Sequence, residues 1–216
     1  MADFVVIGLS TFGEVLAREL YERGANVLVI DQDKEKVQEI KNFVTRAVIA
    51  DATDKQTLAK IIRSNVDAAV ISLGESIERS VMITYFLNQL GIKKIVVKAN
   101  GTDEGRVLEM IGASEVVFPE ADMAKRLATG LVQPQMEDML NLTDRYAIVE
   151  IYVPKKFVGK TLRDLRLRQE YEVNLVAVKQ TIPEAFIAVP SPDFVFKESD
   201  IMVLLGEQEN LEKVMK

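Results

Sequence analysis

Short apolar runs and amphipathic segments alternate from residue 4 to residue 131. The first two apolar runs, residues 4–7 and 27–30, are uninterrupted, as is typical of strands buried on both faces of a sheet. Between them, apolar residues recur at helical spacing over residues 12–20, and Gly24 ends that segment. The pattern predicts a strand, a helix and a second strand that ends at Asp31.

The same alternation predicts a complete α/β domain. We expect further strands at 47–49, 67–73, 94–98 and 115–118, and helices at 37–40, 53–62, 77–90, 102–111 and 120–131. Thr11 with Glu14, and Thr53 with Gln56, have the spacing of capping boxes at the start of two helices. Strands and helices in this order predict a doubly wound parallel sheet with helices on both faces, which is a Rossmann-like fold.

The helix expected at 120–131 differs from the others because no strand follows it. Met123, Leu127 and Leu131 lie on one stripe of this helix. The stripe is apolar enough to need a partner, either the helix's own sheet or a second subunit. Together with the helix at 77–90, it is our candidate for a contact between subunits.

The pattern changes near residue 134, where Pro134 and several polar residues indicate a crossover linker. Shorter apolar runs at 146–153, 173–178, 186–189 and 201–205, followed by a terminal helix, then predict a small α+β domain. We therefore expect a nucleotide-binding domain at 1–133, a linker at 134–143 and an α+β domain at 144–216. A domain of this size has a marginal core, which favours pairing with a second copy.

The turn after the first strand carries the strongest chemical signal. Gly8-x-Ser10-x-x-Gly13 matches the dinucleotide-binding pattern G-x-G-x-x-G, with Ser10 in place of the middle glycine. Glycines let the backbone turn sharply and approach a diphosphate, whose charge the helix N-terminus stabilises. Asp31, at the end of the second strand, is placed to accept hydrogen bonds from a ribose. The turn predicts a nucleotide site.

Polar residues also follow the other expected strands, and such sheets bind ligands at the carboxyl ends of their strands. Asp51 and Lys98 stand there as contacts to adenosine or phosphate, or simply as the first residues of solvated loops. Gly74 stands there as a candidate for a tight turn.

Composition excludes several classes of function. The chain has no Cys and no His, so disulfides, thiolate metal sites and histidine general bases are absent. A net charge of −6 and a pI near 5.0 argue against a nucleic-acid partner. No apolar run approaches the roughly 18 to 20 residues that span a bilayer, and the first strand leaves no room for a signal peptide. We expect a cytoplasmic protein.

One stretch of the α+β domain is strongly basic. The residues concerned are Lys155, Lys156, Lys160, Arg163, Arg166 and Arg168, against Asp164 alone. Such a run is usually a solvated face, and the alternative is an anion site.

Several motifs resemble the regulator-of-potassium-conductance (RCK) family, in particular the cytoplasmic regulatory subunits of bacterial Ktr and Trk potassium uptake systems. In the first half these are Phe12-Gly13, Ala50-Asp51-Ala52-Thr53, Val97-Lys98-Ala99, Ile111-Gly112-Ala113 and Pro119-Glu120-x-Asp122-Met123. In the second half they are Gly159-Lys160-Thr161-Leu162-x-x-Leu165, Val173-x-Leu175-x-Ala177-Val178, Pro190 with Pro192, Asp200 and Gly206. The resemblance spans nearly the whole chain in the right order.

The resemblance implies a non-catalytic subunit that binds an adenine nucleotide, either NAD(H), ATP or ADP. It also implies dimers that assemble into an octameric ring and gate an integral-membrane potassium channel subunit at the inner face of the membrane. A cyclic dinucleotide is a further candidate ligand, at the C-terminal domain. By position, the candidate cofactor-binding residues are Gly8, Ser10, Thr11, Phe12, Gly13, Asp31, Asp51, Ala52, Gly74, Lys98 and Glu120.

Two residue roles follow from the resemblance alone. Glu120 is the candidate ligand of a divalent cation, Mg²⁺ or Ca²⁺, beside the phosphates. Thr11 stands where many relatives carry a phosphate-binding arginine, so the sequence leaves open which nucleotide is bound.

Two other functions compete with a regulatory subunit. An NAD-dependent oxidoreductase would need a proton donor, and Tyr152-x-x-x-Lys156 has the spacing of the short-chain dehydrogenases. Pro154 and the surrounding strand pattern argue that these two residues do not share a helical face. A nucleotide-sensing transcription regulator would need a helix-turn-helix and a basic surface, for which the sequence gives no signal.

Overall fold

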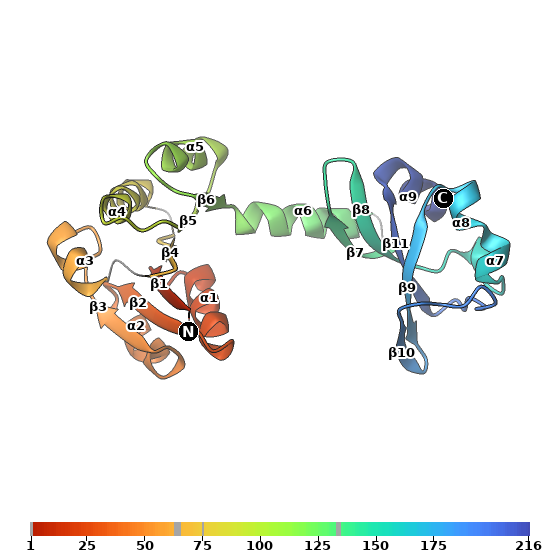
Figure 1. The fold of residues 1–216 in the computed structure, drawn as a ribbon, viewed down its shortest axis with the longest axis horizontal. Coiled ribbons are helices and arrows are strands. Elements are labelled where there is room, and N and C mark those ends of the chain that lie inside the picture. Colours follow the sequence, from red (N-terminus) through yellow and green to blue (C-terminus); the bar gives the residue numbers. More distant parts are fainter. Residues whose placement is uncertain (1, 63–65, 75, 133–134) are drawn as a thin grey trace. The chain divides into compact units, whose positions relative to one another are not determined.

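The computed structural model describes residues 2–62, 66–74, 76–132 and 135–216 (Figure 1). The chain forms two compact units, Met1–Asp122 and Met123–Lys216. The division falls inside helix α6 (Pro119–Val132). Pro134, which we expected to open a linker, lies outside the described residues, and the domain boundaries expected from the sequence stay a prediction.

The first unit is built on a parallel sheet of six strands in the order β3-β2-β1-β4-β5-β6. The strands are β1 (Asp3–Ile7), β2 (Asn26–Asp31), β3 (Arg46–Ile49), β4 (Ala68–Ile71), β5 (Ile95–Lys98) and β6 (Glu115–Val117). The doubly wound parallel sheet predicted from the sequence is confirmed. The strand order reverses between β1 and β4, and at such a point the connections diverge and leave a crevice at the carboxyl ends of the strands.

Helices cover both faces of this sheet (Figure 1). They are α1 (Thr11–Glu22), α2 (Lys34–Ile40), the short 3₁₀ helix η1 (Lys41–Phe43), α3 (Lys55–Ile61), α4 (Ile77–Gln89) and α5 (Thr102–Met110). Successive residues of β1 point to opposite faces, so Val6 packs with α1 and α2, while Val5 and Ile7 pack with α3, α4 and α5. The continuous apolar runs in the sequence arise from this burial on both faces.

Two helix starts differ from the expected capping boxes. Ser10, not Thr11, is the N-cap of α1, and its hydroxyl accepts from the Gly13 N–H at 3.4 Å. Asp54, not Thr53, caps α3 and accepts from the Gln56 N–H at 3.0 Å. In both cases the capping residue keeps an extended backbone. Helix α1 therefore begins one residue earlier than the expected box implies, and α3 begins one residue later.

The second unit is built on an antiparallel sheet in the order β10-β9-β11-β8-β7. Its strands are β7 (Met136–Asn141), β8 (Tyr146–Tyr152), β9 (Asn174–Thr181), β10 (Glu184–Ile187) and β11 (Asp200–Glu207). Its helices are the 3₁₀ helix η2 (Lys155–Phe157), α7 (Leu162–Leu165), α8 (Leu167–Glu170) and α9 (Gln208–Met215). One core packs inside it, around Val149, Met202 and Phe196. The predicted small α+β unit is confirmed.

Strand β7 lies within residues 134–143, where the sequence analysis expected a linker and no strand. Met136–Asn141 pairs with β8 in antiparallel fashion and belongs to the sheet. Its residues, Met-Glu-Asp-Met-Leu-Asn, include no β-branched or aromatic side chain, so the segment gives no strand signal. Packing of Met136 and Met139 on the core and hydrogen bonding to β8 form the strand instead.

The helices of the described residues are all too short or too polar to cross a lipid bilayer.

Candidate functional site

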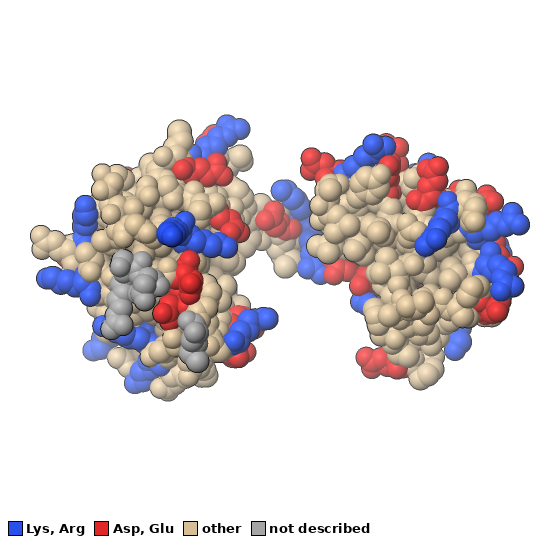
Figure 2. All heavy atoms as spheres, in the orientation of Figure 1, with Lys and Arg blue, Asp and Glu red and all other residues tan. Residues whose placement is uncertain are grey.

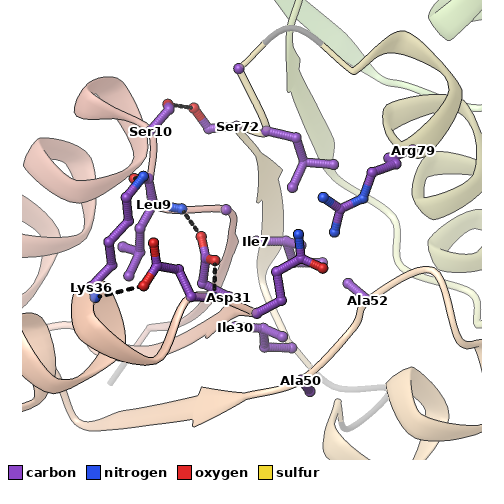
Figure 3. Close-up of a pocket in the computed structure, with 15 residues that line it drawn as sticks. Ile7, Leu9, Ser10, Ile30, Asp31, Lys36, Ala50, Ala52, Ser72 and Arg79 are labelled. Carbon is purple, nitrogen blue, oxygen red and sulfur yellow. Dashed lines mark hydrogen bonds between the residues drawn. The ribbon is translucent and has the colours of Figure 1, made fainter.

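A cavity of about 250 Å³ opens at the carboxyl ends of β1, β2, β3 and β4 (Figure 3). Its lining residues are Ile7, Gly8, Leu9, Ser10, Ile30, Asp31, Gln32, Asp33, Lys36, Ala50, Ala52, Ser72, Leu73, Gly74 and Arg79. Five of the eleven residues expected to bind a nucleotide are among them, namely Gly8, Ser10, Asp31, Ala52 and Gly74. The cavity lies where the strand order reverses, which is the usual ligand position in open α/β sheets.

The turn between β1 and α1 requires glycine at two positions. Gly8 has φ +93°, and a Cβ there would lie 2.3 Å from the carbonyl oxygen of Ser72. A Cβ on Gly13 would lie 2.2 Å from the carbonyl oxygen of Gly8. In both cases the Cβ would meet a backbone carbonyl oxygen, so no movement of a neighbouring side chain relieves the contact. The two glycines allow the first turn of α1 to pack directly on the ends of β1 and β4.

Ser10 occupies the position of the missing middle glycine. Its hydroxyl lies 2.5 Å from the hydroxyl of Ser72, at the end of β4, while also capping α1. Ser72 is fully buried, so this contact satisfies a hydroxyl that water does not reach. The serine therefore joins the β1–α1 turn to β4 in addition to lining the cavity.

Asp31 holds the same turn from the other side. One carboxylate oxygen accepts from the Leu9 N–H at 2.5 Å, and the other accepts from the Asp33 N–H at 2.8 Å. Each carboxylate oxygen has lone-pair capacity for more than one donor. Asp31 can therefore receive ribose hydroxyls while it keeps both backbone bonds.

Lys36 and Arg79 line the cavity, and the sequence analysis missed both. The Lys36 ammonium donates to the carbonyl oxygen of Leu9 at 3.0 Å, which places a cation beside the glycine turn. The Arg79 guanidinium lies 3.6 Å from Asp51. Each is the third residue of a helix that follows a cavity-forming strand. Cations are disfavoured in the first turn of a helix. A basic residue in the first turn of these two helices could therefore have indicated a role in binding a ligand.

Asp51 lies at the edge of the cavity and is largely exposed. It accepts from both the backbone N–H and the hydroxyl of Thr53, at 3.0 and 2.8 Å. These two hydrogen bonds, helped by the positive charge of Arg79, lower the pKa of the Asp51 carboxyl below its ordinary value of 3.8. Asp51 is thus held as an anion facing Arg79.

The remaining expected residues lie outside the cavity lining. Thr11 and Phe12 are in the first turn of α1. Lys98, at the end of β5, forms an ion pair with Glu120 in α6, and this hydrogen bond lowers the pKa of Glu120 below its ordinary value of 4.5. The structure therefore pairs these two residues with each other and does not bring them to the cavity.

The expected cation site at Glu120 has little support from a single chain. Among the described residues, no three acidic side chains are grouped closely enough to hold a metal ion. The Glu120 carboxylate already faces the Lys98 ammonium. The described side chains of one subunit therefore do not by themselves complete a site for a divalent cation.

A second cavity, of about 740 Å³, lies in the second unit beside α7 and α8. Lys and Arg side chains gather at this end of the unit (Figure 2). Lys160, Arg163 and Arg166 from the basic run line the cavity, and Arg163 forms an ion pair with Asp193 at 3.0 Å. Lys156 instead lies over the rings of Phe157 and Tyr171. Three residues of the basic run therefore line this cavity together, whereas Lys156 packs on aromatic rings.

Tyr152 and Lys156 do not form a dehydrogenase pair. Tyr152 is the last residue of β8 and Lys156 belongs to η2 beyond Pro154. They share no helical face, as the sequence indicated.

Family models match almost the whole chain. The model of the TrkA-N domain matches residues 4–119, and the model of the TrkA-C domain matches residues 146–216. Ktr system potassium uptake protein C of Bacillus subtilis (strain 168) is 36% identical over 214 residues, which cover 99% of this chain and 96% of that protein.

Solved structures with the same fold include channels. The RCK domain of GsuK has a TM-score of 0.67 at 19% identity, over 98% of this chain and 46% of that chain. The GsuK channel bound to NAD has a TM-score of 0.66 at 18% identity, over 100% of this chain and 39% of that chain. This likeness shows the fold, and the chain spans less than half the length of those GsuK chains.

A shorter structure resembles the first unit. The NAD(P)-binding domain of an exopolyphosphatase-related protein from Archaeoglobus fulgidus has a TM-score of 0.54 at 28% identity, over 62% of this chain and 99% of that chain.

Proposed function

The chain, with a TrkA-N domain followed by a TrkA-C domain, belongs to the regulator-of-potassium-conductance family, and we propose that it is a nucleotide-binding regulatory subunit of a potassium uptake system. The similarity to a Ktr system potassium uptake protein, over nearly the full length of both chains, supports this assignment. The role is non-catalytic. The subunit acts at the inner face of the membrane through an integral-membrane potassium channel partner.

The observation that carries the proposal is the cavity at the end of β1. It combines a glycine turn at a helix N-terminus, which suits a diphosphate, with Asp31, which suits a ribose. Lys36 adds a cation beside the turn. We assign the ligand as an adenine nucleotide, NAD(H), ATP or ADP, and the NAD-bound GsuK channel and the NAD(P)-binding domain that share the fold support that class.

Binding controls ion flow by changing the shape of an oligomer. In a closed ring, each change of angle between paired subunits adds to one change of ring diameter. We propose that dimers assemble into an octameric ring. The apolar stripe of α6 supports a subunit contact there, because Met123, Leu127 and Leu131 are 60%, 61% and 75% exposed.

Two further ligands belong to the proposal. A divalent cation at Glu120 would take its other ligands from the nucleotide phosphates or from a second copy of the chain, and it would displace Lys98. A cyclic dinucleotide would bind the cavity beside α7 and α8, where Lys160, Arg163 and Arg166 line one wall.

Calorimetry tests the ligand assignment directly. We expect NAD, NADH, ATP or ADP to bind the full chain with one site per subunit, and the affinity of at least one of them to change with Mg²⁺. Absence of heat with all four nucleotides, with and without Mg²⁺, would contradict the proposed function. Turnover of NADH with carbonyl substrates would contradict the non-catalytic role.

A further inference from the structure

The cavity has a phosphate end, a ribose position and a third region that the proposed function leaves unassigned. The glycine turn marks the phosphate end and Asp31 marks the ribose. Beyond Asp31, in the direction of β3, the lining changes to Ala50 and Ala52. A nucleoside with its ribose on Asp31 therefore places its base against these two small side chains. Their size leaves room for a planar ring.

Arg79 reaches this third region from a different element. It is the third residue of α4, and its side chain is 30% exposed. Figure 3 shows the side chain entering the cavity from α4, toward the side where Ile7 and Ala52 lie. The guanidinium is 3.6 Å from Asp51, which directly precedes Ala52. The cation therefore stands at the base end of the cavity rather than at the phosphate end.

Asp51 limits where the guanidinium can go. The carboxylate of Asp51 is itself held by the N–H and the hydroxyl of Thr53, at 3.0 and 2.8 Å. The attraction of this carboxylate favours positions of the guanidinium at the base end of the cavity before any ligand arrives, so less side-chain entropy is lost on binding.

The phosphate end has its own cation. Lys36 bonds to the carbonyl oxygen of Leu9, inside the glycine turn, so the diphosphate charge is met there. A guanidinium is planar and stacks on aromatic rings, which a lysine ammonium does not do in the same way. The two cations in the cavity lining therefore suit two different parts of the ligand.

Resting on the proposed function, we propose that Arg79 binds the base by stacking its guanidinium on the adenine ring, opposite Ala50 and Ala52, with the charge of Asp51 holding the guanidinium at this end of the cavity. Arg79 then contacts the base and leaves the phosphates to the glycine turn and Lys36.

Isothermal titration of adenosine, AMP and ADP into the full chain tests this assignment, with wild type, Arg79→Ala and Arg79→Lys. Stacking predicts that Arg79→Ala weakens all three ligands by the same factor, about 5- to 30-fold. Arg79→Lys should recover little of the loss, because it restores the charge and not the plane. Arg23→Ala is the matched control, since Arg23 pairs with Glu19 on the surface of α1 and should leave binding unchanged.

The outcomes separate the two proposals. A loss that grows from adenosine to ADP, or full recovery in Arg79→Lys, would make Arg79 a phosphate ligand and overturn the stacking assignment. Wild-type affinity in Arg79→Ala would overturn it while the proposed function stands. A wild type that binds none of the three ligands would overturn both. Melting curves of both Arg79 variants establish that a loss of binding is not a loss of fold.

Discussion

The hydroxyls of Ser10 and Ser72 lie 2.5 Å apart and join the β1–α1 turn to the end of β4. This contact exists because the chain has serine where the dinucleotide-binding pattern has its middle glycine. Ser72 is fully buried and Ser10 also caps α1, so one side chain satisfies a buried hydroxyl and a helix end together. The departure from the pattern therefore has a structural role of its own.

Ser10→Gly should lower the free energy of unfolding by about 1–2 kcal/mol, because the Ser72 hydroxyl then loses its partner inside the protein. The lost cap adds only a few tenths of a kcal/mol when glycine replaces serine. Urea denaturation measures the loss. The double variant with Ser72→Ala should recover most of this loss, since no buried hydroxyl remains. A double variant less stable than Ser10→Gly would contradict this account.

The Ser10→Gly variant should also bind ADP more tightly than the wild type in calorimetry, because the backbone can then approach the diphosphate more closely.

Asp31→Ala should weaken the binding of adenine nucleotides by about 1.5–3 kcal/mol, the range for hydrogen bonds to a charged group. Asp31 should also repel a 2′-phosphate, so NADP should bind more weakly than NAD. Titration calorimetry with NAD and NADP measures both effects. Asp103→Ala, which removes an exposed carboxylate from α5, is the matched control. Equal binding of NAD and NADP would argue against a ribose at Asp31.

Gly13→Ala should destabilise the first unit by about 3 kcal/mol or more, because the new Cβ would lie 2.2 Å from the carbonyl oxygen of Gly8. Gly130→Ala in α6 is the same substitution in open space, with nothing within 4 Å of the new Cβ. It should stabilise the chain by about 0.5–1 kcal/mol, as alanine does in an exposed helix. Thermal denaturation of both variants gives the comparison, and similar melting temperatures for the two would refute the crowding at Gly13.

Leu127→Glu should break the oligomer and leave each unit folded, because it places a charge in the middle of the exposed α6 stripe. Ala128→Glu, on the neighbouring face of the same helix, should leave the oligomer in place. Light scattering coupled to size exclusion measures the mass of both variants and the wild type. A wild type that is monomeric at micromolar concentration, with and without nucleotide, would exclude the ring.

The pair of Lys98 and Glu120 should make a small part of the stability depend on pH. The pKa of Glu120 is lower in the folded chain than its ordinary value of 4.5, so the pair stabilises the fold above that value. The contribution is lost as the pH falls through the lowered pKa. The difference in melting temperature between wild type and Glu120→Gln should therefore be positive near neutral pH and vanish in acid. This difference in melting temperature should be small because Glu120 is largely exposed. When Lys98 is replaced by Met in both proteins, the difference should be absent at every pH.

Local patterns were sufficient to predict the first unit. The apolar run of β1, the glycine turn and Asp31 are close in sequence, and the structure places them together as a strand, a turn and a strand end. The family resemblance, which rested on motifs in order along the chain, is confirmed by the matches to the TrkA-N and TrkA-C domains.

Long-range arrangement explains what the sequence did not predict. Arg79 lines the cavity because α4 starts beside β4, across β1 from Asp31. Its place in the first turn of α4 is visible in the sequence, but that place alone does not show which strand ends it meets. Strand β7 forms because β8 offers it hydrogen bonds and not because of its own residues. Lys98 was expected near the phosphates from its place at a strand end, but β5 lies two strands from β1 and its side chain meets Glu120 instead.

The two backbone bonds to Asp31 have a kinetic consequence. Because the carboxylate already holds the N–H groups of Leu9 and Asp33, the turn does not need to be ordered by the ligand. A ready-made turn lowers the entropy lost on association, so entry is limited mainly by diffusion and orientation. Nucleotides of similar shape should then enter at similar rates, and the lifetime of each complex, rather than the speed of its formation, would set how long the subunit reports one nucleotide before it exchanges for another.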